Sequence, residues 1–187
     1  HPSSGAGIIW KNCLAAAFLA EAGGIDAGSI AYTLRHFKGL PHRIEFVGTR
    51  AGAAYYNDSK ATNTDAAVKA LEAFKKPVIL IAGGHDKQTP LEDFMKTVHL
   101  HAKALILIGN ASERFAEEAR RAGVDPVICA GRMEQAVREA EKLAVPGDTV
   151  LLSPACSSYD QYTCYEERGD DFKNIVGHMG TKAEDQP

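Results

Sequence analysis

Four short apolar runs without polar alternation constrain the fold of this 187-residue chain most strongly. Each run is followed by a polar or Gly-rich loop and then by a segment with helical periodicity. Uninterrupted Val/Ile/Leu runs are typical of strands buried on both faces, and strands that alternate with helices form parallel sheets with right-handed crossovers. The pattern therefore predicts an α/β fold with a doubly wound, mostly parallel Rossmann-like sheet. The predicted strands are 78–82, 104–108, 126–129 and 149–152, and the helices after them are 91–99, 112–122, 133–143 and 158–179, the last broken at Gly169.

The first forty residues follow a different pattern, which predicts two helices and a domain boundary. An Ala- and Leu-rich helix is expected over 12–22, and a second over 27–37 behind Asp26, a typical N-cap residue. Gly39-Leu40-Pro41 ends the second helix, and a β-hairpin is expected around a turn at 49–52. We expect residual helices of a preceding domain (1–38, opening on a processing scar), one α/β domain (39–180) and a loose tail (181–187).

Composition excludes several classes of protein. The chain is 45% hydrophobic with a net charge of −3, which is typical of a globular domain and gives no electrostatic footprint for nucleic acid. Its longest apolar run, 13–20, is too short to cross a membrane. The four cysteines lack metal-ligand spacing, so we expect no metal site, and we expect their thiols to be buried in a protein of the reducing cytoplasm. We also expect a monomer.

In open α/β sheets, ligands bind beyond the carboxyl ends of the strands. The first polar segment expected there is Asn57-Asp58-Ser59-Lys60-Ala61-Thr62-Asn63. Thr62 or Asn63 can cap a helix predicted over 66–74. Capping does not account for Lys60, because a positive charge before a helix N-terminus is unfavourable unless an anion binds there.

Gly83-Gly84-His85-Asp86-Lys87 follows the next strand and matches neither a P-loop nor the G-x-G-x-x-G fingerprint. It places a second ammonium, that of Lys87, at the same sheet edge. Two lysines from two loops favour a ligand with more than one carboxylate or phosphate.

Two further segments have both a structural and a functional interpretation. In the segment 153–162, Ser158 and Gln161 fit a capping box, and a helix start of that kind can also hold a carboxylate. In Gly39-Leu40-Pro41-His42-Arg43, Arg43 is either an ordinary surface charge or a phosphate or nucleotide contact at a domain hinge.

These four segments, in this order, resemble the Mur ligases of peptidoglycan synthesis, and within that family the members that add D-glutamate. The resemblance implies the C-terminal Rossmann-like domain with the last helices of the central ATPase domain. The family's P-loop, magnesium ligands and carbamylated lysine have no counterpart in this stretch. No catalytic residue is therefore expected in this chain, which is expected to be inactive alone.

The activity that the resemblance implies uses ATP and Mg²⁺ to convert the carboxylate of UDP-N-acetylmuramoyl-L-alanine to an acyl phosphate, which the amine of D-glutamate then attacks. By motif position, the residues implied to bind D-glutamate are Lys60, Thr62, Lys87, Ser158, Tyr159 and Tyr165. Those implied to contact the nucleotide are Asn12, Arg43 and Asp58. The chain departs from the family's H-N-x-x-N motif at Ile8 and Ile9, which precede Asn12.

Three alternatives remain. One is a stand-alone Rossmann-type module that binds a nucleotide or a small anion. Another is a hydrolase that uses Cys156 as its nucleophile, which requires a nearby base. The third is a related Mur-type ligase with a different acceptor amino acid.

Overall fold

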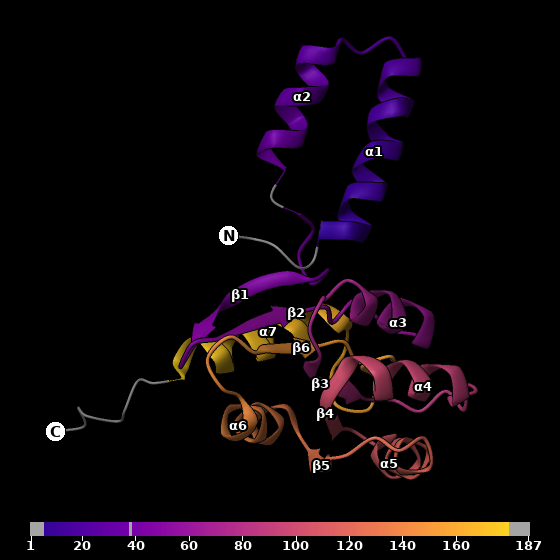
Figure 1. Cartoon of the computed structure of the whole chain (residues 1–187), viewed down its shortest axis with the longest axis vertical. Coiled ribbons are helices and arrows are strands. Elements are labelled where there is room, and N and C mark those ends of the chain that lie inside the picture. The colour runs from indigo at the N-terminus through magenta and orange to yellow at the C-terminus, as the bar shows by residue number, and fades with distance from the viewer. Residues whose placement is uncertain (1–5, 38, 180–187) are drawn as a thin grey trace, which may run out of the picture.

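The computed structural model describes residues 6–37 and 39–179, with side chains from Cys13 onward. These residues form one six-stranded sheet with helices on both faces, which confirms the predicted α/β fold (Figure 1). The strand order is β1-β2-β6-β3-β4-β5, and every neighbouring pair is parallel except β1 and β2. The strands are β1 (Glu45–Arg50), β2 (Ala53–Asn57), β3 (Val78–Gly83), β4 (Ala102–Ile108), β5 (Val127–Gly131) and β6 (Thr149–Leu152).

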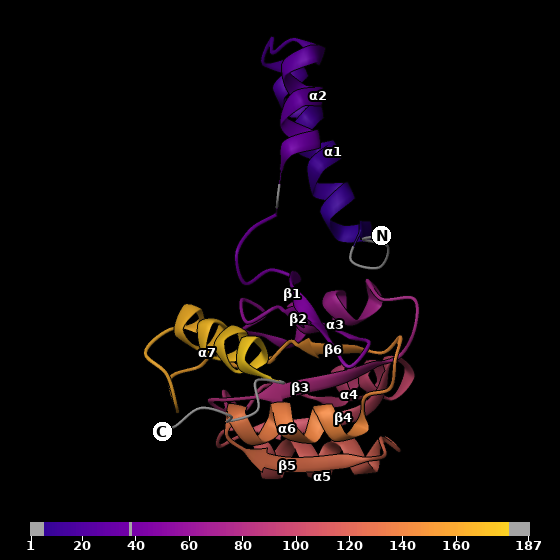
Figure 2. The ribbon, with the colours of Figure 1, turned by 90° about the vertical axis from the view of Figure 1, so that its left-hand side faces the viewer.

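The apolar runs lie in the middle of the sheet because both of its faces are covered. Every residue of β3 is buried, and its side chains alternate between two cores: Leu80 packs with α3, α4 and α5, whereas Ile79 and Ile81 pack with α6 and α7. Figure 2 looks onto the second of these faces, with the strands behind α6 and α7. The covering helices are α3 (Thr64–Glu72), α4 (Glu92–His101), α5 (Ser112–Arg121), α6 (Met133–Leu143) and α7 (Tyr165–His178).

The two N-terminal helices form a hairpin that projects away from the sheet (Figures 1 and 2). Helix α1 (Ala6–Ala22) begins six residues before the predicted start, and α2 (Ala27–His36) begins after Asp26, whose carboxylate accepts the Ser29 N–H at 3.0 Å, as expected of an N-cap. None of the described side chains of α1 or α2 is buried, and neither core includes one of them.

The hairpin between β1 and β2 turns more tightly than predicted. Only Ala51 and Gly52 form the turn, both with positive φ (47° and 82°). Two consecutive residues with positive φ are typical of the turn that matches the twist of a two-stranded ribbon.

The last predicted helix, 158–179, begins later than predicted and is not broken at Gly169. Residues 158–164 form turns, and α7 begins only at Tyr165, with the Cys164 Sγ accepting the Glu167 N–H. The Ser158 and Gln161 pattern does not cap a helix, because the Gln161 side chain donates instead to the Gly131 carbonyl at 2.8 Å.

The N-cap of α3 is one of the two residues predicted for it, Thr62 and Asn63. The Asn63 side chain accepts the Ala66 N–H at 2.9 Å, which confirms Asn63 as the cap.

Gly169 does not break α7, which continues through it to His178. Its role is close packing: a Cβ at this position would overlap Nδ1 of His42 and lie 3.0 Å from Nδ2 of Asn57. The glycine therefore lets α7 approach the residues that flank the hairpin.

We predict that Gly169→Ala lowers the free energy of unfolding by about 1–3 kcal/mol, the usual cost of overpacking a core. Gly177 is the matched control, because it lies in the same helix and a Cβ there would contact nothing within 4 Å. Gly177→Ala should stabilise the protein by roughly 0.5–1 kcal/mol, since Ala is the better helix former. Urea unfolding of both variants checks this, and equal stability for the two would contradict it.

Candidate functional site

Three loops that follow strands β2, β3 and β6 meet at the carboxyl edge of the sheet. The Gly83 N–H donates to the Pro154 carbonyl at 2.8 Å, and the His85 N–H donates to the Ser157 carbonyl at 2.9 Å. From the adjacent strands β3 and β6 the chain leaves to opposite faces, into α4 and α7. This is the switch point at which open α/β sheets bind ligands.

The two predicted lysines lie on this edge, each beside another predicted residue. The Lys60 ammonium lies 5.6 Å from the centroid of the Tyr165 ring. The Lys87 ammonium donates to the Thr62 carbonyl at 3.0 Å. Both lysines are exposed, so both charges are available to an anion from solvent.

The other two predicted residues of the acceptor site differ in exposure. Ser158 is buried, and its carbonyl accepts the N–H groups of Gln161 and Tyr162 in the turn that follows β6. Tyr159 is 72% exposed. Ser158 is joined to the β3 loop through its neighbour Ser157, whose carbonyl accepts the His85 N–H.

Of the three residues expected to contact a nucleotide, the structure describes the side chains of Arg43 and Asp58. The Asn12 side chain lies outside the described residues. Arg43 is half-buried, and its charge acts on Asp58. The Asp58 carboxylate is buried and accepts hydrogen bonds from Ser153 Oγ at 2.9 Å and from the Ile44 N–H at 3.2 Å, and burial raises its pKa to about 6.

His42 connects the segment before β1 to this site. It has a φ of 61°, and its carbonyl accepts the Lys60 N–H at 3.1 Å. Its ring meets the Tyr165 ring edge-on, with 6.0 Å between centroids, and its Nδ1 lies 3.1 Å from Nδ2 of Asn57. His42 thus contacts both sides of the Lys60–Tyr165 pair.

Sequence reasoning missed three residues that order the loops. No role was predicted for Asn57, whose fully buried amide accepts the Ser59 N–H and donates to Glu45. Arg114 forms a bidentate ion pair with Asp86, in which Nη2 donates to Oδ1 at 2.6 Å and Nε donates to Oδ2 at 2.8 Å. These hydrogen bonds lower the pKa of the Asp86 carboxyl. Such a pair could be found only by knowing that α5 lies beside the β3 loop.

The third missed residue is Arg168, which is 1% exposed. Its Nε donates to Ser59 Oγ and its Nη2 to the Ser59 carbonyl, both at 2.9 Å. Burial lowers the pKa of the guanidinium to about 10. A charged residue in a helix pattern ordinarily indicates a solvent-facing position, so the sequence carried no signal for this one.

The cysteines do not support nucleophilic chemistry. Cys156 is buried, and this raises the pKa of its thiol to about 12, which leaves almost no thiolate at neutral pH. The expectation that all four thiols are buried is wrong for Cys129, which is exposed; Cys13 and Cys164 are half-buried.

The described residues contain no group of three or more His, Cys, Asp or Glu side chains that could hold a metal ion. Nor does that part of the chain contain a helix long and apolar enough to span a membrane.

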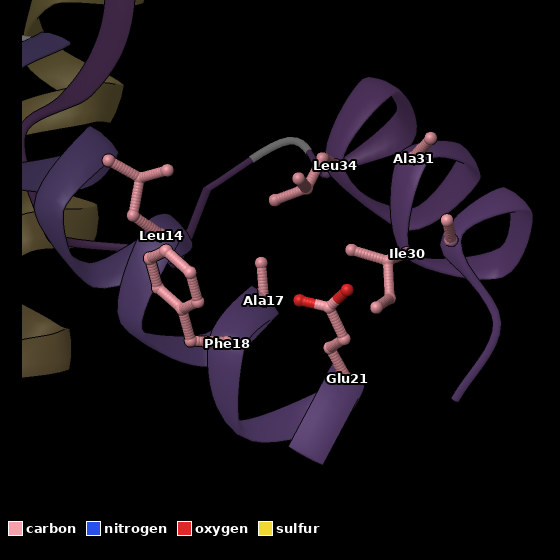
Figure 3. A pocket seen from close by; sticks show the side chains of 8 residues that line it. Leu14, Ala17, Phe18, Glu21, Ile30, Ala31 and Leu34 are labelled. Atoms are coloured by element: carbon pink, nitrogen blue, oxygen red, sulfur yellow. The ribbon is translucent and has the colours of Figure 1, made fainter. Parts of the chain in front are cut away.

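A separate groove of about 210 Å³ lies between α1 and α2. Figure 3 shows Leu14 and Phe18 of α1 across the groove from Ile30 and Leu34 of α2, and Glu21 is the one charged side chain among the described residues that line it. The described residues of this lining do not provide the converging polar groups that orient a small-molecule ligand. We therefore assign the candidate site to the sheet edge.

Comparison with known sequences identifies relatives over most of the chain. Residues 42–156 match the family model described as "Mur ligase, glutamate ligase domain". A UDP-N-acetylmuramoylalanine--D-glutamate ligase of Pelotomaculum thermopropionicum is 48% identical over 166 residues, which cover 89% of this chain and 36% of that protein. The protein of the same name from Lactobacillus acidophilus is 41% identical over 172 residues, which cover 92% and 38%. This chain thus spans little more than a third of the length of these relatives.

Solved structures share the fold at low sequence identity. A UDP-N-acetylmuramate-alanine ligase of Thermotoga maritima superposes with a TM-score of 0.62 at 15% identity, over 89% of this chain and 37% of that one. A bifunctional folylpolyglutamate synthase/dihydrofolate synthase of Yersinia pestis gives 0.59 at 14% identity, over 81% and 35%. These two similarities support the architecture and say nothing of the ligand.

The raised pKa of Asp58 predicts a specific dependence of stability on pH. Because the folded-state pKa (about 6) lies above the ordinary value of 3.8, the native state binds the proton more tightly than the unfolded chain. The Asp58 contribution is therefore most favourable below pH 4 and is lost as pH rises through 6. Asp58→Asn removes this titration. The free energy of unfolding of the variant minus that of the original protein should therefore be about 2–3 kcal/mol more positive at pH 7 than at pH 4. Urea unfolding across that range measures the difference, and a constant difference would contradict the assignment.

Proposed function

The chain belongs to the Mur ligase family as its glutamate ligase domain, and we propose that it is the D-glutamate-binding part of an ATP-dependent ligase. In the proposed reaction, ATP phosphorylates the carboxylate of UDP-N-acetylmuramoyl-L-alanine. The amine of D-glutamate then attacks the activated carbonyl and phosphate leaves, which forms the amide bond used in peptidoglycan synthesis. An ATP-dependent reaction of this kind takes place in the cytoplasm.

One observation carries the proposal: two exposed ammonium groups, from different loops, lie at one sheet edge and each contacts a second residue of the proposed site. Lys60, Thr62 and Lys87 all lie within the segment that matches the family model. D-glutamate carries two carboxylates, and a hydrogen bond to a charged group contributes roughly 1.5–3 kcal/mol. We propose that Lys60 and Lys87 bind these carboxylates, that Thr62, Ser158 and Tyr159 complete the site, and that the Tyr165 ring packs against the acceptor.

Holding the acceptor in this way positions its amine, which is the contribution that a binding domain makes to catalysis. We assign the nucleotide-facing side of the domain to Arg43, Asp58 and Asn12. We propose that ATP and Mg²⁺ are bound mainly by other parts of the ligase.

We further propose that residues 1–38 are the end of a preceding domain and that the α/β domain begins at about residue 39. This division is supported by the helical hairpin, whose described side chains are all outside the two cores. Leu14, Phe18 and Leu19 of α1 are 53%, 69% and 75% exposed, an apolar surface that a neighbouring domain would cover.

A protein that begins at residue 39 should therefore unfold at the same urea midpoint as the 187-residue chain, within error, and bind D-glutamate equally. The comparison of the two urea curves is the measurement. A loss of more than about 1 kcal/mol on truncation, a large fraction of a domain's stability, would refute the division.

Lys60→Ala and Lys87→Ala should each weaken D-glutamate binding by roughly tenfold or more, because each removes one charged contact to a carboxylate. NMR titration of the 187-residue chain with D-glutamate measures this. Lys75→Ala is the matched control, since Lys75 is an exposed lysine that precedes β3, at the opposite end of that strand. In the complete ligase, the same two variants should raise the KM for D-glutamate and leave that for ATP nearly unchanged.

The titration also separates the competing interpretations. Unchanged affinity in both lysine variants would refute the assigned roles. Binding of inorganic phosphate without binding of D-glutamate would instead favour a stand-alone anion-binding module. Binding of another amino acid in preference to D-glutamate would indicate a related ligase with a different acceptor.

A further inference from the structure

We propose that Arg168 is a positioning residue of the acceptor site, which fixes Lys60 against Tyr165 and places a buried positive charge beneath the acceptor's carboxylates. The inference rests on the proposed function and deepens it. It starts from a guanidinium that is 1% exposed yet bonded to the loop that carries Lys60.

The hydrogen bonds of Arg168 join two segments that are distant in the sequence. Its Nε and Nη2 both donate to Ser59, at the hydroxyl and at the carbonyl, in the fork geometry that only arginine offers. The Ser59 hydroxyl in turn donates to the Tyr165 carbonyl at 2.7 Å. Lys60 is the next residue after Ser59, so this chain of bonds sets the distance between the ammonium and the ring of Tyr165.

The same guanidinium also lies against the loop that leads to Lys87. Gly84 has a φ of 134°, and a Cβ on it would lie 3.1 Å from Arg168 Nη1 and 3.2 Å from Cys156 Cβ. Arg168 thus lies beside the loops that follow β2, β3 and β6. Those loops and the start of α7 carry every residue assigned to D-glutamate.

No carboxylate of the described residues forms an ion pair with Arg168, and its Nη1 has no hydrogen-bond partner among them. Burying a charge without a counter-ion is costly, and the two bonds to Ser59 offset only part of that cost. Asp160 attracts the charge without an ion pair. A dicarboxylate at the sheet edge would supply the missing negative charge, and attraction between charges is stronger where water is excluded.

The first test compares Arg168→Gln with Arg168→Lys in the 187-residue chain, by NMR titration with D-glutamate. Arg168→Gln removes both the fork and the charge, and we expect a loss of affinity of roughly tenfold or more. Arg168→Lys restores the charge without the fork, so we expect it to recover only part of the affinity. The matched control is Arg138→Gln, an exposed arginine of α6 that pairs with Glu134, which should bind as the original protein does.

A second, less disruptive variant tests the proposal even if the Arg168 variants fail to fold. Ser59→Ala removes the hydroxyl between Arg168 and Tyr165, and we expect several-fold weaker D-glutamate binding. Ser112→Ala is its control, because that buried hydroxyl donates to the Gly109 carbonyl at the start of α5. Combining Arg168→Gln with Ser59→Ala should cost less than the sum of the two single changes, since both break one interaction.

Steady-state kinetics in the complete ligase distinguish positioning from a merely structural role. Positioning predicts that Arg168→Gln and Ser59→Ala raise the KM for D-glutamate and leave that for ATP unchanged. A structural role predicts less folded enzyme, which lowers kcat and leaves both KM values unaltered. If the variants fold and keep the original affinity and KM for D-glutamate, this inference is overturned and the proposed function stands. If the original protein itself does not bind D-glutamate, both are overturned.

Discussion

Hydrogen bonds between the segments at the carboxyl edge of the sheet hold the candidate site together. The loop after β3 is bonded to the loop after β6 through the Gly83 and His85 N–H groups, and the Asp58 N–H donates to the Leu152 carbonyl at 2.8 Å. Without these bonds, Lys60, Lys87 and Ser158 would belong to three independent loops. With them, the three residues belong to loops that are bonded to one another or to a common strand, which favours binding because less freedom is lost when the ligand arrives.

At the candidate site the ammonium groups of Lys60 and Lys87 face solvent, whereas the nearby carboxylates of Asp58 and Asp86 already have partners within the protein. Asp86 is paired with Arg114, and Asp58 is buried beside Ser153 with a raised pKa. Neither of these two exposed ammonium groups forms an ion pair with a carboxylate of the described residues. Such an edge attracts anions, and the effect weakens as salt is added.

The sequence was informative where local pattern and tertiary structure agree. Uninterrupted apolar runs predicted the central strands because burial on both faces leaves no room for polar alternation. The placement of Lys60 and Lys87 followed from the rule that loops after parallel strands share an edge. The predicted helix 158–179 was wrong over its first part, 158–164, where the polar groups bond elsewhere: the Asn110 N–H donates to Asp160, and Gln161 donates to Gly131. Arg168 was beyond prediction, since only the packed fold shows which helical charges face inward.

The position of His42 has a mechanical consequence. The backbone carbonyl of His42 accepts the Lys60 N–H, and its ring lies edge-on against Tyr165. The chain before His42 leads to the α1–α2 hairpin. The residue through which the chain enters the sheet domain therefore contacts two residues of the candidate site. A change in the backbone of His42 would for this reason displace Lys60 and Tyr165 together.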